Sequence, residues 1–297
     1  MTLPMADRPS PAESVPTAPA GAVAGWRVVR ASVTGTSHGA TGTPCQDASD
    51  AVRLASPDGE VLALACADGA GSARLSQEGA ALACAAILGE VRDYVESYPL
   101  RAASRDTVEA WFLGVHAAVA DRAAQLDAAP RDLACTLLLA VVGPDAAVFA
   151  QIGDGAIVVD APEPAGYAPV FWPQSGEYAN MTFFATEPEA LSRLEVAFVR
   201  DRIVEEVALF SDGLQALALR FEDRAAHAPF FRPMFTQLRG QPPGDAPGLV
   251  AGLRGFLDSP RVNARTDDDK TLVLATRRPT VDEPAAAGVR PTVDATV

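Results

Sequence analysis

The sequence predicts a layered fold that combines helices with β-sheet, of the α/β or α+β class. Three features of the chain indicate it. Short apolar runs typical of strands stand at both ends of the region that is expected to be ordered, residues 26–276. Two long segments with apolar residues at helical spacing follow the first strands, and most other strands come in the middle. Because strands and helices do not alternate one by one, a regular βαβ repeat is not expected.

The first ordered element is expected to be a strand at residues 26–33, which begins at Trp26. A hairpin should follow, because strands at 52–55 and 61–66 flank the turn sequence Ser56-Pro57-Asp58-Gly59. The chain before this region, residues 1–25, is rich in Pro and Ala and predicts a leader without regular structure.

Two helices are predicted next. Ser76 begins the first, with Glu78 in the turn where the helix dipole favours a negative charge, and Pro99 stops it. Ser104 begins the second, which Pro130 ends. In both, apolar residues recur at helical spacing, so each helix should bury one face. These residues are Ala80, Cys84, Ile87, Leu88, Val91, Val95 and Tyr98 in the first helix, and Val108, Trp111, Phe112, Val115, Val119 and Leu126 in the second.

The rest of the ordered region alternates between apolar runs and turn sequences, and then turns helical before a closing strand. Strands are expected at 133–142, 146–153, 156–160, 195–200, 206–210 and 270–276, and helices at 229–239 and 247–257. One domain should therefore span residues 26–276.

Residues 277–297 read as a flexible tail with a repeated pentapeptide. The two copies are Arg278-Pro279-Thr280-Val281-Asp282 and Arg290-Pro291-Thr292-Val293-Asp294. Thr280 and Thr292 could be kinase targets that dock a phosphothreonine reader. The alternative is a duplicated linker of no consequence.

Composition excludes several classes of protein. With 24 Lys and Arg against 38 Asp and Glu, the net charge of -14 argues against binding to nucleic acid or anionic lipid. No apolar run approaches the ~20 residues that cross a bilayer, and the N-terminus does not read as a secretion signal. We therefore expect a cytoplasmic monomer. The four cysteines lack CxxC spacing and should be free thiols, and three scattered histidines make a zinc site unexpected.

Three aspartates stand beside apolar strands, namely Asp68, Asp212 and Asp268. An ionised carboxylate at the edge of a core is costly unless it is paired or binds a cation. Few lysines are near, so a divalent cation is the expected partner, and magnesium or manganese suits oxygen ligands. Glycine after Asp68 lets the chain turn, so that the Gly69 carbonyl can face the same ion.

Asp-Gly also marks simple turns. A simple turn is the interpretation expected for Asp58, which lies midway between two pairing strands. For Asp154, which Gly155 follows, a turn and a ligand are equally good interpretations of the local sequence.

Read in order, these motifs resemble the metal-dependent protein phosphatase family of type 2C, especially its compact bacterial members. The resemblance spans residues 26–276 and implies two packed, mostly antiparallel β-sheets flanked by helices. It implies a Ser/Thr protein phosphatase with a dinuclear Mn/Mg site, acting on phosphoproteins opposite a Ser/Thr kinase in bacterial signalling. The motifs are Gly35-Thr36-Ser37-His38, Cys45-Gln46-Asp47-Ala48, Asp68-Gly69-Ala70-Gly71-Ser72, Cys135-Thr136-Leu137, Gly153-Asp154-Gly155, Phe210-Ser211-Asp212-Gly213-Leu214 and Asp268-Asp269-Lys270-Thr271.

Carried over by position, the resemblance gives each metal residue a role. Asp68 would bridge both ions, and the Gly69 carbonyl would bind one of them. Asp212 and Asp268 would complete the shell of the other ion. Asp269 fills a position where relatives often have Asn, so the choice between Asp268 and Asp269 stays open.

Two further aspartates have roles by the same resemblance. Asp154 matches the aspartate linked to an additional, looser metal, and Asp47 would hold the metal-bound water. That water would attack phosphorus in line with the leaving alkoxide, while the metals neutralise the phosphoryl oxygens.

The sequence departs from the family pattern in two places. Relatives often carry a phosphate-binding Arg before the Gln-Asp pair, and here His38 is the nearest substitute, unless its role is structural. Relatives also often have His where this chain has Ala70. These departures keep two alternatives open. One is a catalytically weak phosphoprotein-binding regulator, and the other is a small-molecule phosphatase on the same fold.

Overall fold

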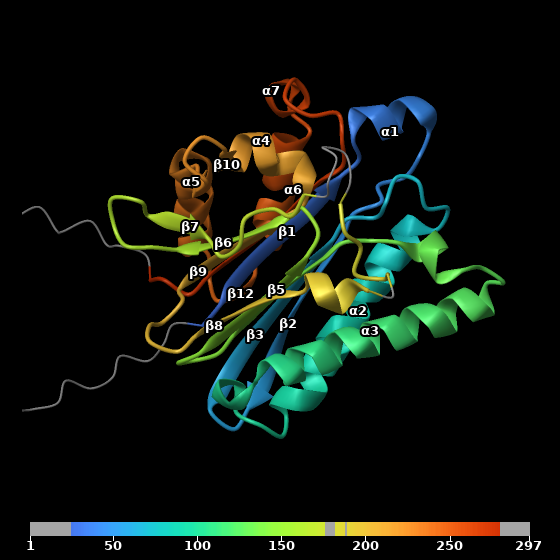
Figure 1. The fold of residues 1–297 in the computed structure, drawn as a ribbon. Helices are drawn as coiled ribbons and strands as arrows, with labels where there is room; N and C mark the ends of the chain where they lie inside the picture. Colours follow the sequence, from blue (N-terminus) through green and yellow to red (C-terminus); the bar gives the residue numbers. More distant parts are fainter. Residues whose placement is uncertain (1–24, 176–181, 188, 280–297) are drawn as a thin grey trace, which may run out of the picture.

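The computed structural model describes residues 25–175, 182–187 and 189–279 of the chain (Figure 1). The predicted leader, apart from Gly25, lies outside the described residues. So do Thr280 and Thr292 of the tail repeat, whose predicted modification remains a hypothesis.

Two β-sheets stack face to face, and every neighbouring pair of described strands is antiparallel except β12 and β1. We call the six-stranded sheet A and the five-stranded sheet B. Sheet A has the order β12 (Gly244–Asp245), β1 (Arg27–Val33), β13 (Lys270–Thr276), β9 (Glu206–Phe210), β6 (Ala156–Asp160) and β7 (Tyr167–Pro169). Sheet B has the order β2 (Ala48–Ser56), β3 (Gly59–Ala67), β4 (Leu137–Val142), β5 (Ala147–Ile152) and β8 (Glu195–Val199).

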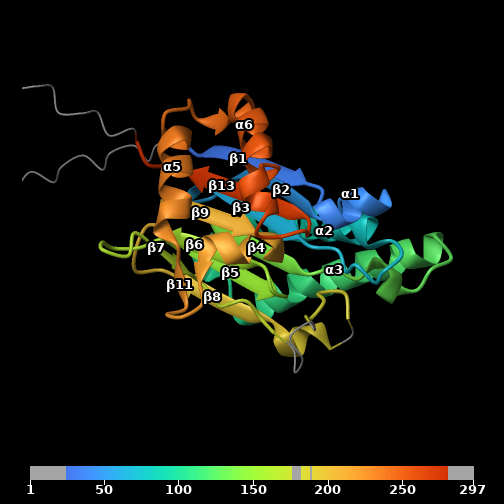
Figure 2. The same cartoon turned by 90° about the horizontal axis from the view of Figure 1, so that it is seen from above.

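Helices cover the outer faces of both sheets (Figures 1 and 2). The helices α2 (Ser76–Val95) and α3 (Arg105–Gln125) lie on sheet B, whereas α5 (Ala228–Arg239) and α6 (Pro247–Leu257) lie on sheet A. The predicted sandwich of two mostly antiparallel sheets between helices is thereby confirmed.

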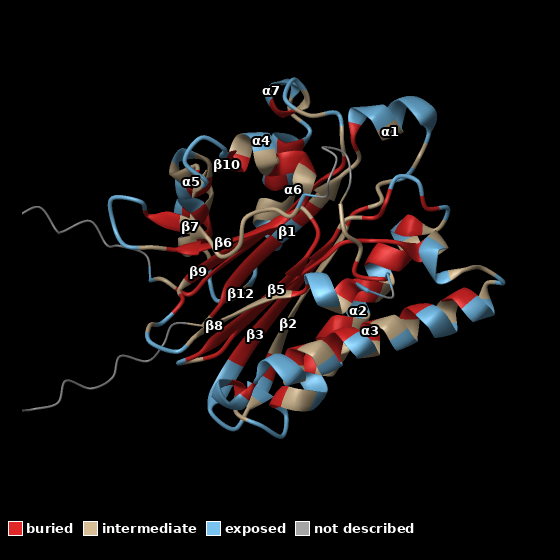
Figure 3. Cartoon of the chain, in the orientation of Figure 1, coloured by how far each residue is buried: buried red, intermediate tan, exposed pale blue. Residues whose placement is uncertain are grey.

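Strand β3 shows why its sequence is apolar without interruption. Val61 and Ala63 pack toward α2 and α3, while Leu62 and Leu64 pack into the layer between the two sheets. A strand that is buried on both faces needs apolar side chains at every position. Figure 3 shows the resulting buried centre, with exposed residues mostly in loops, on outer helix faces and at strand ends.

The predicted hairpin and the start of α3 are confirmed. Ser56 pairs with Gly59 across the turn. The φ of Gly59 is +123°, a backbone conformation that glycine adopts easily. Ser104 caps α3 by accepting a hydrogen bond from the N–H of Thr107.

Several predicted boundaries were wrong. The helix α2 ends at Val95, so Tyr98 lies beyond it and is 57% exposed rather than part of the buried face. Strand β4 begins at Leu137, because Pro130–Leu133 forms a 3-10 helix. Leu126 is the C-cap of α3 and is only half-buried.

Short elements with little apolar periodicity were not predicted. The helix α1 (Thr36–Thr41) buries none of its residues, which is why its sequence carries no helical pattern. The others are β7, α4 (Gln215–Ala218), β10 (Leu219–Arg220), β11 (Ala225–Ala226), β12, α7 (Pro260–Asn263) and the 3-10 helices Leu100–Ala102, Ala190–Arg193 and Asp212–Leu214.

All four cysteines are free, as predicted, and three of them are buried. Among the helices of the described residues, none has the length and apolar character needed to cross a membrane.

Candidate metal centre

The predicted aspartates gather at one end of the sandwich, where strands of both sheets begin or end. Asp68 directly follows β3, and Asp212 lies just beyond the end of β9, an interior strand of sheet A. Asp154 lies in the turn that joins β5 to β6, so it connects the two sheets. The strand ends of both sheets therefore bring residues far apart in sequence to the same place.

Three carboxylates form a tight cluster there. Asp68, Asp154 and Asp212 each offer a carboxylate oxygen, and these three oxygens lie within 4.8 Å of one another. Burial, followed by the charge of Asp154, raises the pKa of Asp212 to about 7. Burial and the charges of Asp47 and Asp212 raise the pKa of Asp68 well above its usual value. Carboxylates this close need a proton or a cation between them.

The donor set fits a divalent cation. Asp154 Oδ1 and Asp212 Oδ1 are buried and have no hydrogen-bond partner among the residues described. Buried polar atoms almost always have partners, so these oxygens point to a partner that the described residues do not supply. A cluster with only oxygen donors matches the preference of magnesium and manganese.

Asp68 is fixed through its backbone. Its N–H donates to the hydroxyl of Thr136 at 2.9 Å, and its carbonyl accepts from the N–H of Thr136 at 2.8 Å. The following Gly69 has no room for a side chain, because a Cβ would lie 2.7 Å from the Gln46 carbonyl oxygen. The sequence motif that contains Thr136 does not by itself reveal this positioning role.

Asp47 reaches the cluster from the start of β2. The hydroxyl of Ser211 donates to its Oδ2 at 2.7 Å, and the N–H of Thr271 donates to Ser211 Oγ at 3.0 Å. Burial raises the pKa of Asp47 to about 7, helped by the charges of Asp269 and Asp268. Its other oxygen, Oδ1, is buried and has no partner among the described residues.

Asp269 uses both carboxylate oxygens to hold the surrounding loops. Its Oδ1 accepts from the N–H of Gly35 and its Oδ2 from the N–H of Gln46, both at 2.6 Å. His38, on α1, also places Nδ1 3.1 Å from Asp269 Oδ2, a close approach without a hydrogen bond. This contact favours the structural interpretation of His38 over the phosphate-binding one.

Asp268 lies close enough to the acidic cluster to act on it through its charge. Its charge contributes to the raised pKa values of Asp212 and Asp47. Its Oδ1 accepts a hydrogen bond from the N–H of Asp269 at 2.8 Å. The two neighbouring aspartates therefore have different surroundings.

Two glutamines that sequence reasoning missed hold the Asp154 turn. Gly153 donates its N–H to Gln174 Oε1 at 2.9 Å, and its carbonyl accepts from the N–H of Gln174 at 3.2 Å. Gln215 Nε2 donates to the Asp154 carbonyl at 2.6 Å. Gly153 has a φ of +113°, which a residue with a side chain rarely adopts. No local pattern in the sequence links these residues.

A family model described as protein phosphatase 2C matches residues 34–258. The chain belongs to the protein phosphatase 2C family. Serine/threonine-protein phosphatase 3 of Escherichia coli (strain K12) is 40% identical over 252 residues, which cover 84% of this chain and 98% of that protein. The predicted family and the predicted enzyme class, a phosphoprotein phosphatase, are confirmed.

Solved structures share the fold of this phosphatase at low sequence identity. PppA, a regulatory component of T6SS in Pseudomonas aeruginosa, has a TM-score of 0.54 and 16% identity, covering 86% of this chain and 98% of its own. A bacterial serine phosphatase has a TM-score of 0.53 and 13% identity, covering 86% of this chain and 99% of its own. These two likenesses support the fold alone.

The side chain of Ala70 is buried in this phosphatase. Ala70 is 6% exposed and packs against Ala73, Ala134 and the half-buried Phe184. An apolar methyl group cannot give or take a proton, so this position contributes no acid to the site.

Proposed function

We propose that this phosphatase hydrolyses phosphoserine and phosphothreonine in proteins, with two divalent cations, Mn²⁺ or Mg²⁺, held at the acidic end of the sandwich. The cluster of three carboxylate oxygens within 4.8 Å, from Asp68, Asp154 and Asp212, carries the proposal. The similarity to the Escherichia coli Ser/Thr phosphatase supports the choice of phosphoserine and phosphothreonine.

The proposed ligands come from four strand ends. Asp68 would lie between the two ions, with the Gly69 carbonyl on one of them. Asp212 and Asp268 would hold the other ion, and Asp154 would serve a further, more weakly bound ion. We assign Asp268 rather than Asp269 to the metal, because backbone N–H groups occupy both Asp269 oxygens.

When bound, the cations would neutralise the phosphoryl oxygens and lower the pKa of the water that attacks phosphorus. The chain's own residues orient the reactants. Asp47 Oδ1 has no partner among the described residues, so it can accept a hydrogen bond from that water. Ser211 keeps Asp47 in place by donating to its Oδ2. The products are inorganic phosphate and the free serine or threonine hydroxyl, which takes a proton from solvent because Ala70 has none to give.

The biological setting follows from the reaction. A phosphoprotein substrate implies a Ser/Thr kinase that the enzyme opposes, and we place both in bacterial cytoplasmic signalling with the phosphatase as a monomer. The closed position of Ala70 and the orientation of His38 toward Asp269 favour one second candidate, a phosphoprotein-binding regulator with weak turnover.

Phosphate release from a phosphothreonine peptide, compared with release from free phosphoserine, tests the proposal. Release should require Mn²⁺, stop with EDTA and be lost in Asp212→Asn, and the peptide should be preferred. Faster release from free phosphoserine would indicate a small-molecule phosphatase. Saturable phosphopeptide binding without turnover, by folded protein loaded with Mn²⁺, would establish the regulator.

A further inference from the structure

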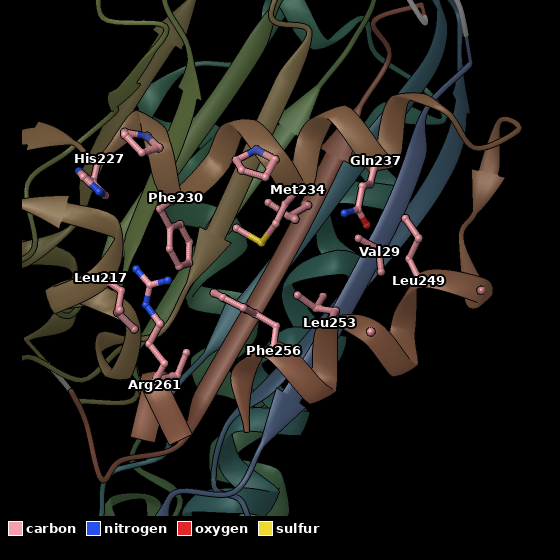
Figure 4. A pocket seen from close by; sticks show the side chains of 16 residues that line it. Val29, Leu217, His227, Phe230, Met234, Gln237, Leu249, Leu253, Phe256 and Arg261 are labelled. Carbon is pink, nitrogen blue, oxygen red and sulfur yellow. The ribbon is translucent and has the colours of Figure 1, made fainter. Parts of the chain in front are cut away.

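A cavity of about 660 Å³ lies between α5 and α6 on the outer face of sheet A (Figure 4). Val29 of β1 and Leu274 of β13 line it from the sheet side. None of the candidate metal residues lines it, so it is separate from the acidic cluster. Its volume falls in the range of about 300–1,000 Å³ that is usual for small-molecule sites.

The walls of this cavity are aromatic and apolar. Phe230 of α5 and Phe256 of α6 meet across it, with ring centroids 5.9 Å apart and an angle of 57° between the rings. Met234 lies beside them and can contact a further ring through its sulfur. Phe256 is 38% exposed, which leaves a large apolar ring open to the cavity. An aromatic group that enters here can join an existing pair of rings.

Two glycines of α6 leave room along one wall. Gly248 and Gly252 line the cavity, and a Cβ built at either position meets no atom within 4 Å. The helix backbone itself therefore forms part of the cavity surface. Gly255, on the same helix, has the same open surroundings but does not line the cavity.

One end of the cavity is positively charged. Arg261 of α7 extends across this end toward Phe230 and His227 (Figure 4). No hydrogen bond or ion pair joins the Arg261 side chain to any residue that the structure describes. The helix α5 begins directly after His227, so the positive end of its dipole lies at the same end. An unpaired guanidinium beside aromatic rings can bind a carboxylate while the rings bind apolar surface.

We propose that this cavity binds an amphipathic aromatic anion, with its rings between Phe230, Phe256 and Met234 and its carboxylate on Arg261. This ligand class matches the cavity at both ends. The apolar wall suits the rings of the ligand, and Arg261 supplies the positive charge for its carboxylate. The proposed binding is independent of the phosphatase reaction.

Binding of 2-naphthoate to the full chain, measured by isothermal titration calorimetry, tests this site. One molecule should bind saturably per chain, and the neutral 2-naphthylmethanol should bind about tenfold more weakly or worse. Gly252→Leu should abolish binding because the leucine side chain fills the cavity. Gly255→Leu places the same side chain outside the cavity and should bind 2-naphthoate normally.

The charge is tested separately with Arg261→Gln, which should remove the advantage of 2-naphthoate over the alcohol. Arg254→Gln, on α6 and outside the cavity, is the matched control. All four variants should hydrolyse the phosphopeptide at the wild-type rate, and this activity would show that they are folded. Absence of saturable binding up to about 1 mM, or equal binding by the Gly252→Leu and Gly255→Leu variants, would overturn the site. Equal affinity for the acid and the alcohol would overturn the assignment of an anion.

Discussion

Thr136 forms hydrogen bonds with both the backbone N–H and the backbone carbonyl of Asp68. Its hydroxyl accepts from the Asp68 N–H at 2.9 Å, and its own N–H donates to the Asp68 carbonyl at 2.8 Å. Asp68 directly follows β3, and Thr136 stands immediately before β4, so the pairing of these two strands continues into the acidic cluster. The position of the proposed bridging carboxylate thus depends on a residue outside the proposed ligand set.

Thr136→Val tests this dependence, because valine keeps the shape of threonine but cannot accept the hydrogen bond. Loss of a residue that orients a metal ligand typically weakens metal binding by about 10-fold to 100-fold. We expect that loss in Mn²⁺ affinity, measured by calorimetry. Thr236→Val is the matched control, since the Thr236 hydroxyl is exposed on α5 and donates to the Arg232 carbonyl. Equal Mn²⁺ affinities in the two variants would contradict the positioning role of Thr136.

Asp268 and Asp269 should respond differently to the same substitution. Asp269→Asn places an amide NH₂ against a backbone N–H, so we expect a loss of about 1–3 kcal/mol in the free energy of unfolding of the metal-free protein. Asp268→Asn removes a charge from a crowded cluster, so it should weaken Mn²⁺ binding without destabilising the metal-free fold. Urea unfolding and calorimetry on both variants separate the two effects. If Asp269→Asn weakened only Mn²⁺ binding, the assignment of Asp268 to the metal would be wrong.

Gly213 follows Asp212 at a point of close backbone contact. A Cβ there would lie 2.0 Å from the carbonyl oxygen of Asp269. Gly213→Ala should therefore destabilise the protein by about 1–3 kcal/mol or more, as overpacking does in a tight interior. Gly89→Ala on α2, where a Cβ meets no atom within 4 Å, should instead stabilise it by about 0.5–1 kcal/mol. Similar unfolding midpoints in urea for the two variants would contradict the close contact at Gly213.

The stability of the metal-free protein should fall as the pH rises. The pKa values of Asp47 and Asp212 are raised from 3.8 to about 7, mainly by burial. Between these pH values the folded chain holds protons that the unfolded chain has released, so the free energy of unfolding decreases as the pH increases. We expect a lower Tm at about pH 8 than at about pH 5 in EDTA.

Saturating Mn²⁺ should reduce this pH dependence, because a bound cation stabilises the charged carboxylates. Asp212→Asn should also reduce it in the metal-free protein, since one of the titrating groups is removed. A Tm in EDTA that rises from about pH 5 to about pH 8 would contradict the raised pKa values.

The long elements could be predicted because their pattern reflects burial. The sequence of β3 is apolar at successive positions since one face packs on helices and the other on sheet A. The helix α1 could not be predicted in this way, because its position depends on long-range contacts. Asp269 accepts a hydrogen bond from the N–H of Gly35, the N-cap residue of α1. Ser37, within α1, donates its N–H to the carbonyl of Asp267 at 3.0 Å.

The same distinction holds for the site. Asp68 and Asp212 could be singled out because each follows an apolar strand, and the turn residue Asp154 joins them in the structure. No local pattern connects Gln215 to Asp154 or Ser211 to Asp47. Those hydrogen bonds form only after the two sheets stack and bring separate strand ends together.

The central claim is that the clustered aspartates hold two catalytic cations, and the number of Mn²⁺ ions bound per chain tests it most directly. Equilibrium dialysis of the metal-free enzyme should find at least two Mn²⁺ ions per chain, with phosphopeptide hydrolysis rising as they bind. Asp212→Asn should lose both an ion and the hydrolysis. Full hydrolysis by wild-type protein with no bound metal, or unchanged Mn²⁺ binding by Asp212→Asn, would contradict the claim.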